Sequence, residues 1–111
     1  MPAYIPQRGD LVWLNFTPQS GHEQAGKRPA FVVSPQSYNK KTGLALFCPV
    51  TSQVKGYPFE VAIPAGGEVR GVILSDQVKS LDWAARQATF ITRSSSQTTE
   101  EVLAKVAVLI E

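Results

Sequence analysis

The apolar residues of this chain come in short runs that glycines and prolines interrupt. Eight glycines and eight prolines are spread over the 111 residues. This spacing favours many short strands joined by turns. The sequence therefore predicts a mainly β protein. The expected strands cover residues 10–16, 30–33, 44–50, 59–63, 71–75 and 88–91.

The first expected strand is apolar on both of its faces. Leu11 and Trp13 point to one face, and Val12 and Leu14 point to the other. A strand with two apolar faces is packed on both sides, so we expect it to be central in the sheet. Trp13 and Trp83 are expected in the core or at a dimer interface.

Two connections between strands are expected to be locally ordered. Residues 38–43, YNKKTG, predict a hairpin turn in which Gly43 is free to adopt positive φ. Residues 81–86 predict a single short helical turn, with Ser80 as its cap and Asp82 in its first turn.

The C-terminal residues carry a helical signal. Thr98 and Glu101 have the spacing of a capping box, and apolar residues follow at helical spacing. These residues are Val102, Leu103, Val106, Leu109 and Ile110. We therefore expect an α-helix over residues 99–109 that packs on the sheet or on a second subunit. The predicted fold is one domain over residues 1–111, a small, strongly twisted, partly open antiparallel barrel that ends in this helix.

The composition is that of an ordinary globular protein, with 43% hydrophobic and 18% charged residues. No apolar run is long enough to cross a bilayer, and the N-terminus lacks a signal-peptide pattern, so we expect a cytoplasmic protein. A single cysteine, Cys48, and a single histidine cannot form a conventional zinc site within one chain. We expect Cys48 to be a small buried hydrophobe. The net charge of +2 permits nucleic-acid binding without requiring it.

Residues 21–35 combine a polar loop with the beginning of a strand. The loop contains His22 and Glu23, and Arg28 stands directly before Pro29. Proline pushes the preceding residue toward extended backbone, which places Arg28 at the mouth of the strand. A guanidinium beside an imidazole and a carboxylate suits the binding of a phosphate. We therefore expect the functional site at this loop.

Four stretches, GDLVWLNF, GHEQAGKRPAFVVSP, PVTSQVKGYPFEV and DQVKSLDWAAR, follow one another over nearly the whole chain. Together they resemble the MazF/PemK (Kid) toxins of bacterial toxin–antitoxin pairs. The resemblance implies an SH3-like barrel that forms homodimers. It also implies an endoribonuclease that needs neither metal nor cofactor and cuts single-stranded RNA, such as mRNA, at short sequences. The products would carry a 2′,3′-cyclic phosphate and a 5′-hydroxyl, and a cognate antitoxin would block the RNA site.

The resemblance also assigns residues of this chain. The implied catalytic residues are Arg28, Thr51, Glu23 and His22, of which the histidine matches PemK-type members. Asp76 matches an aspartate that PemK-type members use. Those members also have an arginine two residues before it, where this chain has Leu74. On this point the chain follows the MazF branch.

Cleavage of RNA without a metal needs a base for the 2′-hydroxyl, a cation for the phosphorane and an acid for the leaving 5′-oxygen. Arg28 suits the cation, because its planar fork holds two phosphate oxygens. Thr51 can donate a hydrogen bond to the same phosphate. The base is either His22, whose unperturbed pKa is about 6.5, or Glu23, if the site raises its pKa.

Further residues near the expected loops are candidates for holding the RNA. Lysines would bind phosphates, whereas aromatic rings and amides would bind unstacked bases. The RNA-binding candidates are Gln24, Lys27, Ser52, Lys55, Asp76, Gln77 and Lys79, with Phe16 and Tyr57 as further partners for bases. We expect the loop 21–27 to cover bound RNA and to be poorly ordered without it.

Two other functions are compatible with the predicted fold. CcdB toxins poison gyrase through C-terminal residues that include a tryptophan, whereas this chain ends in KVAVLIE. An SH3-like module could also bind RNA without cleaving it. Gyrase-dependent DNA breakage would identify the first alternative, and RNA that is bound but left intact would identify the second.

Overall fold

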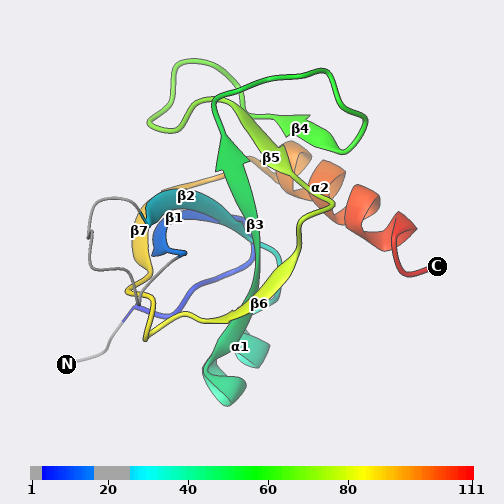
Figure 1. Cartoon of the computed structure of the whole chain (residues 1–111). Helices are drawn as coiled ribbons and strands as arrows, with labels where there is room; N and C mark the ends of the chain where they lie inside the picture. The colour runs from blue at the N-terminus through cyan, green and yellow to red at the C-terminus, as the bar shows by residue number, and fades with distance from the viewer. Residues whose placement is uncertain (1–3, 17–25) are drawn as a thin grey trace.

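The structure is a computed structural model that describes residues 4–16 and 26–111 (Figure 1). These residues form a mainly β fold with a short helix and a C-terminal helix, so the predicted fold class is confirmed. Neither helix of the described residues is long and apolar enough to cross a membrane. The elements are β1 (Asp10–Asn15), β2 (Lys27–Val32), α1 (Gln36–Thr42), β3 (Leu44–Thr51), β4 (Glu60–Ala62), β5 (Val72–Leu74), β6 (Lys79–Asp82), β7 (Thr89–Arg93) and α2 (Ser96–Val108).

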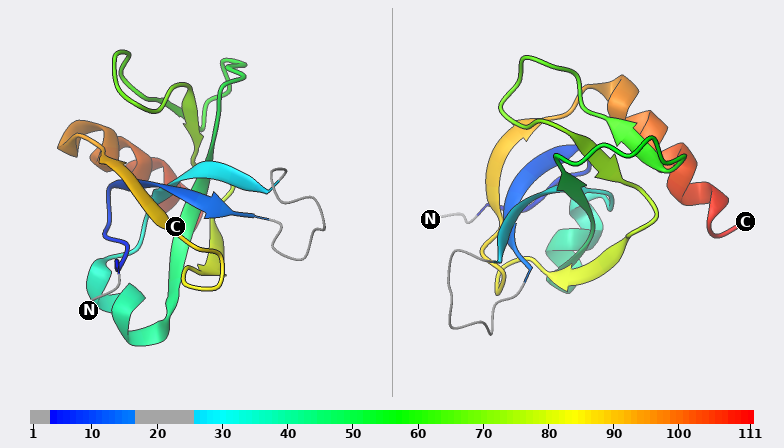
Figure 2. Two further views of the ribbon diagram at one scale, coloured as in Figure 1. Left: turned by 90° about the vertical axis from the view of Figure 1, so that its left-hand side faces the viewer. Right: turned by 45° about the horizontal axis from the view of Figure 1, so that its top comes forward.

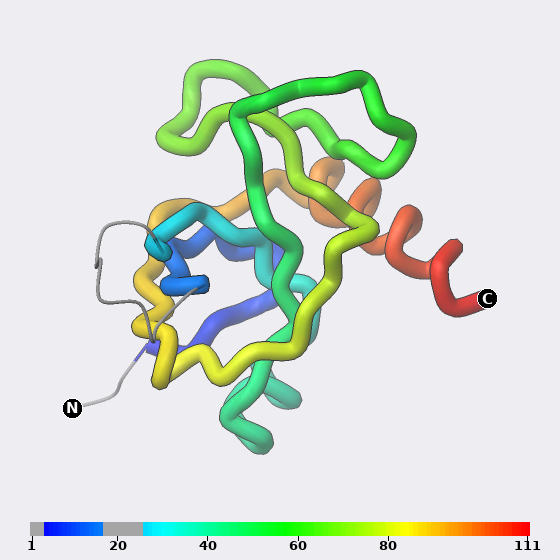
Figure 3. Tube along the Cα trace, in the orientation of Figure 1, coloured from blue at the N-terminus to red at the C-terminus, as the bar shows by residue number. Residues whose placement is uncertain are grey.

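The strand β3 connects two halves of an antiparallel sheet. The strand order is β4-β5-β3-β2-β1-β7, and β6 pairs with β3 beside this path. The beginning of β3 pairs with β6, with Leu44 opposite Asp82, whereas its end pairs with β5, with Thr51 opposite Val72. The chain therefore runs along β3 from α1 at one end of the molecule to two loops at the other (Figure 3).

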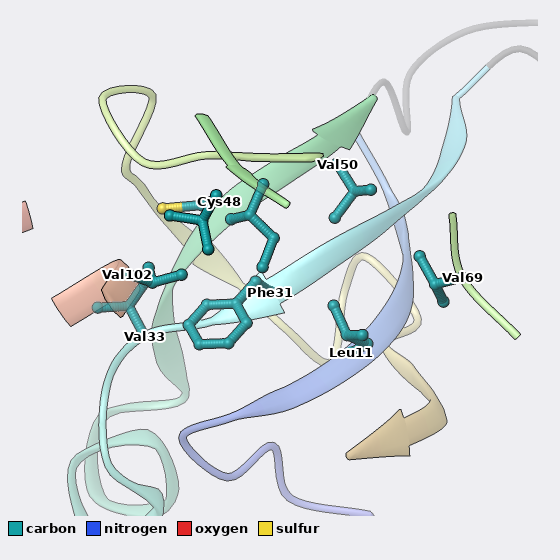
Figure 4. Packing of buried hydrophobic residues seen from close by; sticks show 9 residues of the cluster. Leu11, Phe31, Val33, Cys48, Val50, Val69 and Val102 are labelled. Atoms are coloured by element: carbon teal, nitrogen blue, oxygen red, sulfur yellow. The ribbon is translucent and has the colours of Figure 1, made fainter. Parts of the chain in front are cut away.

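Apolar side chains pack on both faces of β1, β2 and β3. The first cluster is shown in Figure 4, and its buried members are Leu11, Phe31, Val33, Cys48, Val50, Val61, Val69, Ile73 and Val102. The second cluster contains Val12, Leu14, Ala30, Val32, Ala45 and Phe47. Two predictions are thereby confirmed: the first strand is central, between β2 and β7, and Cys48 is buried.

The two tryptophans have different environments. Trp83 packs against the second cluster and donates its Nε1–H to the carbonyl oxygen of Asn39 at 3.0 Å. Trp13 is 42% exposed. Trp83 therefore belongs to the core. The position of Trp13 at a dimer interface stays a prediction.

The hairpin turn predicted for residues 38–43 is wrong, because this segment belongs to helix α1. The side chain of Asn39 is fully buried and donates to the carbonyl oxygens of Pro6 at 2.8 Å and Ser34 at 3.1 Å. These contacts with distant segments stabilise the helix, and local sequence does not reveal them. Gly43 does adopt the predicted positive φ, 75°, where it ends the helix.

The single helical turn predicted for residues 81–86 begins later than predicted, at Asp82, whose carbonyl oxygen accepts the Arg86 N–H at 3.1 Å. Its first residues belong to β6, because the free edge of β3 offers them a pairing partner, with Leu81 opposite Ala45. The chain turns after this strand, and the Asp82 carboxylate accepts hydrogen bonds from the N–H groups of Ala84 and Ala85. Asp82 therefore caps a turn, and Ser80 lies within the strand.

The helix α2 begins three residues before the predicted position. Ser95, rather than Thr98, is the N-cap, and its hydroxyl accepts the Thr98 N–H at 3.1 Å. Thr98 is buried inside the first turn. Val102 packs in the first cluster, and Figure 2 shows α2 lying along the side of the molecule that carries β4 and β5. The predicted packing of this helix on the sheet is confirmed.

Candidate functional site

Arg28 and Thr51 line one pocket from two paired strands, β2 and β3. β2 begins at Lys27 rather than at Ala30, so Arg28 lies within the strand and not at its mouth. β2 and β3 pair as far as Ala30 opposite Pro49, and Arg28 and Thr51 each lie two residues beyond this pair. Both residues line one pocket of about 420 Å³.

This pocket, called the arginine pocket below, has two arginines and no carboxylate among the described residues of its wall. Within residues 4–16 and 26–111, the single ion pair joins Arg93 to Asp10 at 2.6 Å. Neither Arg28 nor Arg70 forms an ion pair with these residues. Two unpaired cations around one cavity favour an anion, and the guanidinium fork matches the oxygens of a phosphate. The lining residues are Arg28, Pro29, Val50, Thr51, Ser52, Gln53 and Arg70.

Gly71 allows the chain to bring Arg70 close to Thr51. Its φ is +112°, and an added Cβ would lie 2.1 Å from the Thr51 carbonyl oxygen, so only a residue without a side chain fits. On the other side of Arg70, Val69 is buried in the first cluster. The backbone of Arg70 is thus fixed on both sides. Arg70 is absent from the sequence-based site, although a glycine directly before a strand signals close backbone approach.

The Thr51 hydroxyl is oriented by its own loop. Its Oγ1 accepts the backbone N–H of Gln53 at 3.1 Å. A hydroxyl that accepts a hydrogen bond still has its proton to donate. Thr51 can therefore donate to an anion in the arginine pocket while its oxygen is held in place.

A second pocket of about 560 Å³, called the tyrosine pocket, adjoins the first, and Thr51 and Gln53 line both. Its wall combines an aromatic ring, apolar side chains and both signs of charge. Such a mixture suits a planar heterocycle with polar edges better than a phosphate. The other lining residues are Lys55, Gly56, Tyr57, Pro58, Glu60, Leu74, Asp76 and Gln77.

A hydrogen bond joins two walls of the tyrosine pocket. The Tyr57 hydroxyl donates to Asp76 Oδ2 at 2.7 Å, and this bond, together with the negative charge of Asp76, raises the pKa of Tyr57. Burial, with a smaller contribution from Asp76, raises the pKa of the Cys48 thiol to about 12. A thiol with such a pKa is not a nucleophile at neutral pH, so Cys48 is structural.

The loop between β3 and β4, which forms one side of the tyrosine pocket, is held mainly by hydrogen bonds. The Glu60 carboxylate accepts the N–H groups of Lys55 and Gly56, each at 3.1 Å. From α2, the Lys105 ammonium donates to the carbonyl oxygen of Pro58 at 2.7 Å. These contacts keep the pocket formed in a loop whose side chains are largely exposed.

Six of the predicted site residues and the further candidate Tyr57 lie at the two pockets. Ser52 joins Arg28 and Thr51 in the arginine pocket. The tyrosine pocket contains Lys55, Asp76 and Gln77.

The remaining predicted residues lie elsewhere. Lys27, at the start of β2, and Lys79, in β6, line neither pocket. Phe16 packs against the second cluster. The structure leaves undescribed the candidates His22, Glu23 and Gln24, together with the loop expected to cover RNA. No group of three His, Cys, Asp or Glu side chains that could hold a metal ion occurs in the described part of the chain.

Residues 7–110 match the family described as PemK-like, MazF-like toxin of type II toxin–antitoxin system. The endoribonuclease toxin MazF of Escherichia coli (strain K12) is 51% identical over 107 residues, which cover 96% of each chain.

Solved structures agree with this match. A crystal structure of MazF from Deinococcus radiodurans has 53% identity and a TM-score of 0.87, covering 97% of this chain and 98% of that one. A MazE–MazF crystal structure from the same organism has 47% identity and a TM-score of 0.87, covering 97% of both chains.

Proposed function

Since the chain belongs to the PemK-like, MazF-like toxins of type II toxin–antitoxin systems and is an endoribonuclease of that family, we propose that it cleaves single-stranded mRNA at the arginine pocket. The observation that carries the proposal is that Arg28 and Thr51 line one pocket, whose described lining residues include two arginines and no carboxylate. Cleavage of mRNA would stop translation and growth.

The proposed reaction is an attack of the 2′-hydroxyl on the neighbouring phosphorus. The bond between phosphorus and the 5′-oxygen breaks, which leaves a 2′,3′-cyclic phosphate and a 5′-hydroxyl. Arg28 stabilises the charge that develops on the phosphate oxygens, and the Thr51 hydroxyl donates a hydrogen bond to the same group. The 2′-hydroxyl proton goes to Glu23 or His22, and the leaving oxygen takes up a proton. Neither metal nor cofactor is required for these steps.

The tyrosine pocket then binds a base next to the cleaved bond. It shares Thr51 and Gln53 with the arginine pocket, so a nucleotide whose phosphate lies at Arg28 reaches it directly. Gln77 offers an amide and Tyr57 an aromatic face to an unstacked base. Lys55 adds affinity for the RNA backbone.

The proposed partners are a second copy of this chain and an antitoxin resembling MazE. Three apolar residues at the end of α2 are exposed, and their burial in a homodimer would be favourable; they are Val108, Leu109 and Ile110. A complex with an antitoxin is known for the related MazF of Deinococcus radiodurans. We further propose that residues 1–111 act as one cytoplasmic domain, because β1, β2 and β3 contribute to both apolar clusters.

The test is cleavage of a long RNA in the presence of EDTA by the wild type and by Arg28→Ala. The wild type should cleave at defined sites, and the variant should be slower by about 10²–10³-fold, the usual cost of removing one transition-state donor. Lys41→Ala, which removes an exposed charge in α1, is the matched control and should cleave normally.

Three outcomes would reject the proposal. They are an intact RNA with the wild type, equal cleavage by Arg28→Ala, and activity that disappears with EDTA. Binding without cleavage would favour an RNA-binding module, and gyrase-dependent DNA breakage would favour a CcdB-like toxin. Mapping the 5′ ends of the products would define the recognition sequence.

A further inference from the structure

We propose that Arg70 is a second catalytic residue, whose guanidinium binds the reacting phosphate together with Arg28. The inference rests on the proposed function and adds a residue that lies outside the motifs of the sequence analysis. It starts from the observation that Arg28, in β2, and Arg70, two residues before β5, line the same pocket.

The backbone around Arg70 is built for a fixed position. Val69 is buried in the first cluster, and Gly71 lies so close to Thr51 that no side chain fits between them. The pocket is thus formed by three segments: β2 with Arg28, the end of β3 with Thr51, and the entry to β5 with Arg70. The backbone of Arg70 is therefore held beside the pocket before a ligand binds.

The side chain of Arg70 has no structural partner in the described residues. It is exposed, and no hydrogen bond or ion pair joins it to those residues. A purely structural arginine would bond to a carboxylate or to backbone carbonyl groups. Arg86 shows this pattern, because its Nη1 donates to the carbonyl oxygen of Phe16 at 2.9 Å. Arg70 is therefore available for a ligand.

The chemistry of the pocket calls for two cations. The phosphodiester carries one negative charge in the ground state, and a further negative charge develops as the 2′-oxygen attacks. Arg28 can hold two oxygens, and a second guanidinium can neutralise the charge that appears in the transition state. Because the pKa of arginine lies above about 12, Arg70 stays protonated throughout and transfers no proton. Position 74 holds leucine, so Arg70 is the residue that brings a second guanidinium to this pocket.

The experiment measures kcat and KM for wild type, Arg70→Gln, Arg70→Lys and the control Lys41→Gln, which makes the same charge change on α1. We expect kcat to fall about 10²-fold for Arg70→Gln and less for Arg70→Lys, which keeps the charge and loses the fork. The double variant Arg28→Ala/Arg70→Gln should be less impaired than the product of the two single effects, because both groups act on one phosphate. The thermal unfolding temperature should stay unchanged.

A binding measurement provides a readout that does not depend on cleavage. RNA with a 2′-deoxyribose at the cleaved nucleotide has no attacking hydroxyl and remains intact. The slope of log affinity against log salt should be shallower by about 0.7 for Arg70→Gln, the value for one phosphate contact on a single strand, and unchanged for Lys41→Gln.

The outcomes separate this inference from the proposed function. If the wild type binds RNA but never cleaves it, the proposed function fails, and the salt slope still decides whether Arg70 contacts a phosphate. The inference is overturned if the kcat and the salt slope of Arg70→Gln both equal those of Lys41→Gln. A change in KM with unchanged kcat would also overturn it, because Arg70 would then bind RNA without stabilising the transition state.

Discussion

The two pockets that meet at Thr51 differ in the charges of their walls. Among the residues that the structure describes, the arginine pocket combines Arg28 and Arg70 without a carboxylate, whereas the tyrosine pocket is lined by Lys55, Asp76 and Glu60. Uniform positive charge attracts a phosphate of any nucleotide. Mixed donors and acceptors distinguish one base from another. Under the proposed function, the arginine pocket carries out the chemistry and the tyrosine pocket provides the selectivity.

Among the variants that test this division between the pockets, the largest effect on cleavage is expected from Thr51→Val, which changes a residue that lines both pockets. The kcat should fall about tenfold to a hundredfold, because one donor to the phosphate is lost. The Gln53 N–H also loses its acceptor, which should lower the free energy of unfolding by about 1 kcal/mol. Single-turnover cleavage and urea unfolding measure the two effects.

Thr42→Val is the control for this change. The Thr42 hydroxyl accepts the N–H of Leu44 at 3.1 Å in α1, which reproduces the local contact far from the pockets. The free energy of unfolding of Thr42→Val should fall by a similar amount, and its cleavage activity should be unchanged. A Thr51→Val enzyme with normal kcat and raised KM would break the assignment of Thr51 to chemistry.

Gly71→Ala is expected to slow cleavage less than Thr51→Val does and to lower the free energy of unfolding more. The new Cβ would contact the Thr51 carbonyl oxygen, so the arginine pocket must widen while the rest of the sheet stays folded. Gly66→Ala is the matched control, because Gly66 also has positive φ, 97°, but nothing within 4 Å of an added Cβ. The control should lose about 1 kcal/mol from backbone strain, and Gly71→Ala about 2 kcal/mol more from the clash.

Urea unfolding of both glycine variants provides the comparison, and cleavage rates show whether the pocket has widened. Several-fold slower cleavage is expected for Gly71→Ala alone. Equal stability losses in the two variants would show that the close approach of Gly71 to Thr51 does not shape the pocket.

The smallest effect is expected from Asp76→Asn in the tyrosine pocket. A raised pKa means that Tyr57 keeps its proton to a higher pH than an ordinary tyrosine, which titrates near 10. Removing the charge of Asp76 should therefore lower the pKa of Tyr57 toward that value. Absorbance during an alkaline titration, with Tyr57→Phe to identify the signal, measures the shift.

The same variant tests the role of the tyrosine pocket in selectivity. Its kcat should change about twofold at most, whereas the preference for the base next to the cleaved bond should relax. A large fall in kcat with an unchanged site preference would place Asp76 in the chemistry and contradict the division between the pockets.

Much of the fold could be predicted from the sequence, because apolar runs and turn residues define most strands locally. β1 through β5 and β7 lie where the sequence places them, with bounds shifted by up to three residues. The helix α1 and the strand β6 could not be predicted in this way. α1 depends on the burial of Asn39 against Pro6, and β6 depends on the free edge of β3. Both are consequences of tertiary contacts.

The candidate site shows the same limit. Arg28 and Thr51 stand in motifs, and strand register explains why they share a pocket. Arg70 stands in no motif, and its position depends on how closely Gly71 approaches the end of β3.

The contact between Trp83 and Asn39 makes tryptophan fluorescence a probe of the structure. The indole of Trp83 is bonded to α1 and packed on the second cluster, whereas the indole of Trp13 stands partly in solvent. A soluble quencher should therefore quench the fluorescence of Trp13 first. The remaining fluorescence of Trp83 then reports on the packing of α1. Binding of a partner over Trp13 would protect the Trp13 fluorescence from the quencher. One unlabelled sample could thus distinguish the loosening of the core from the covering of the surface.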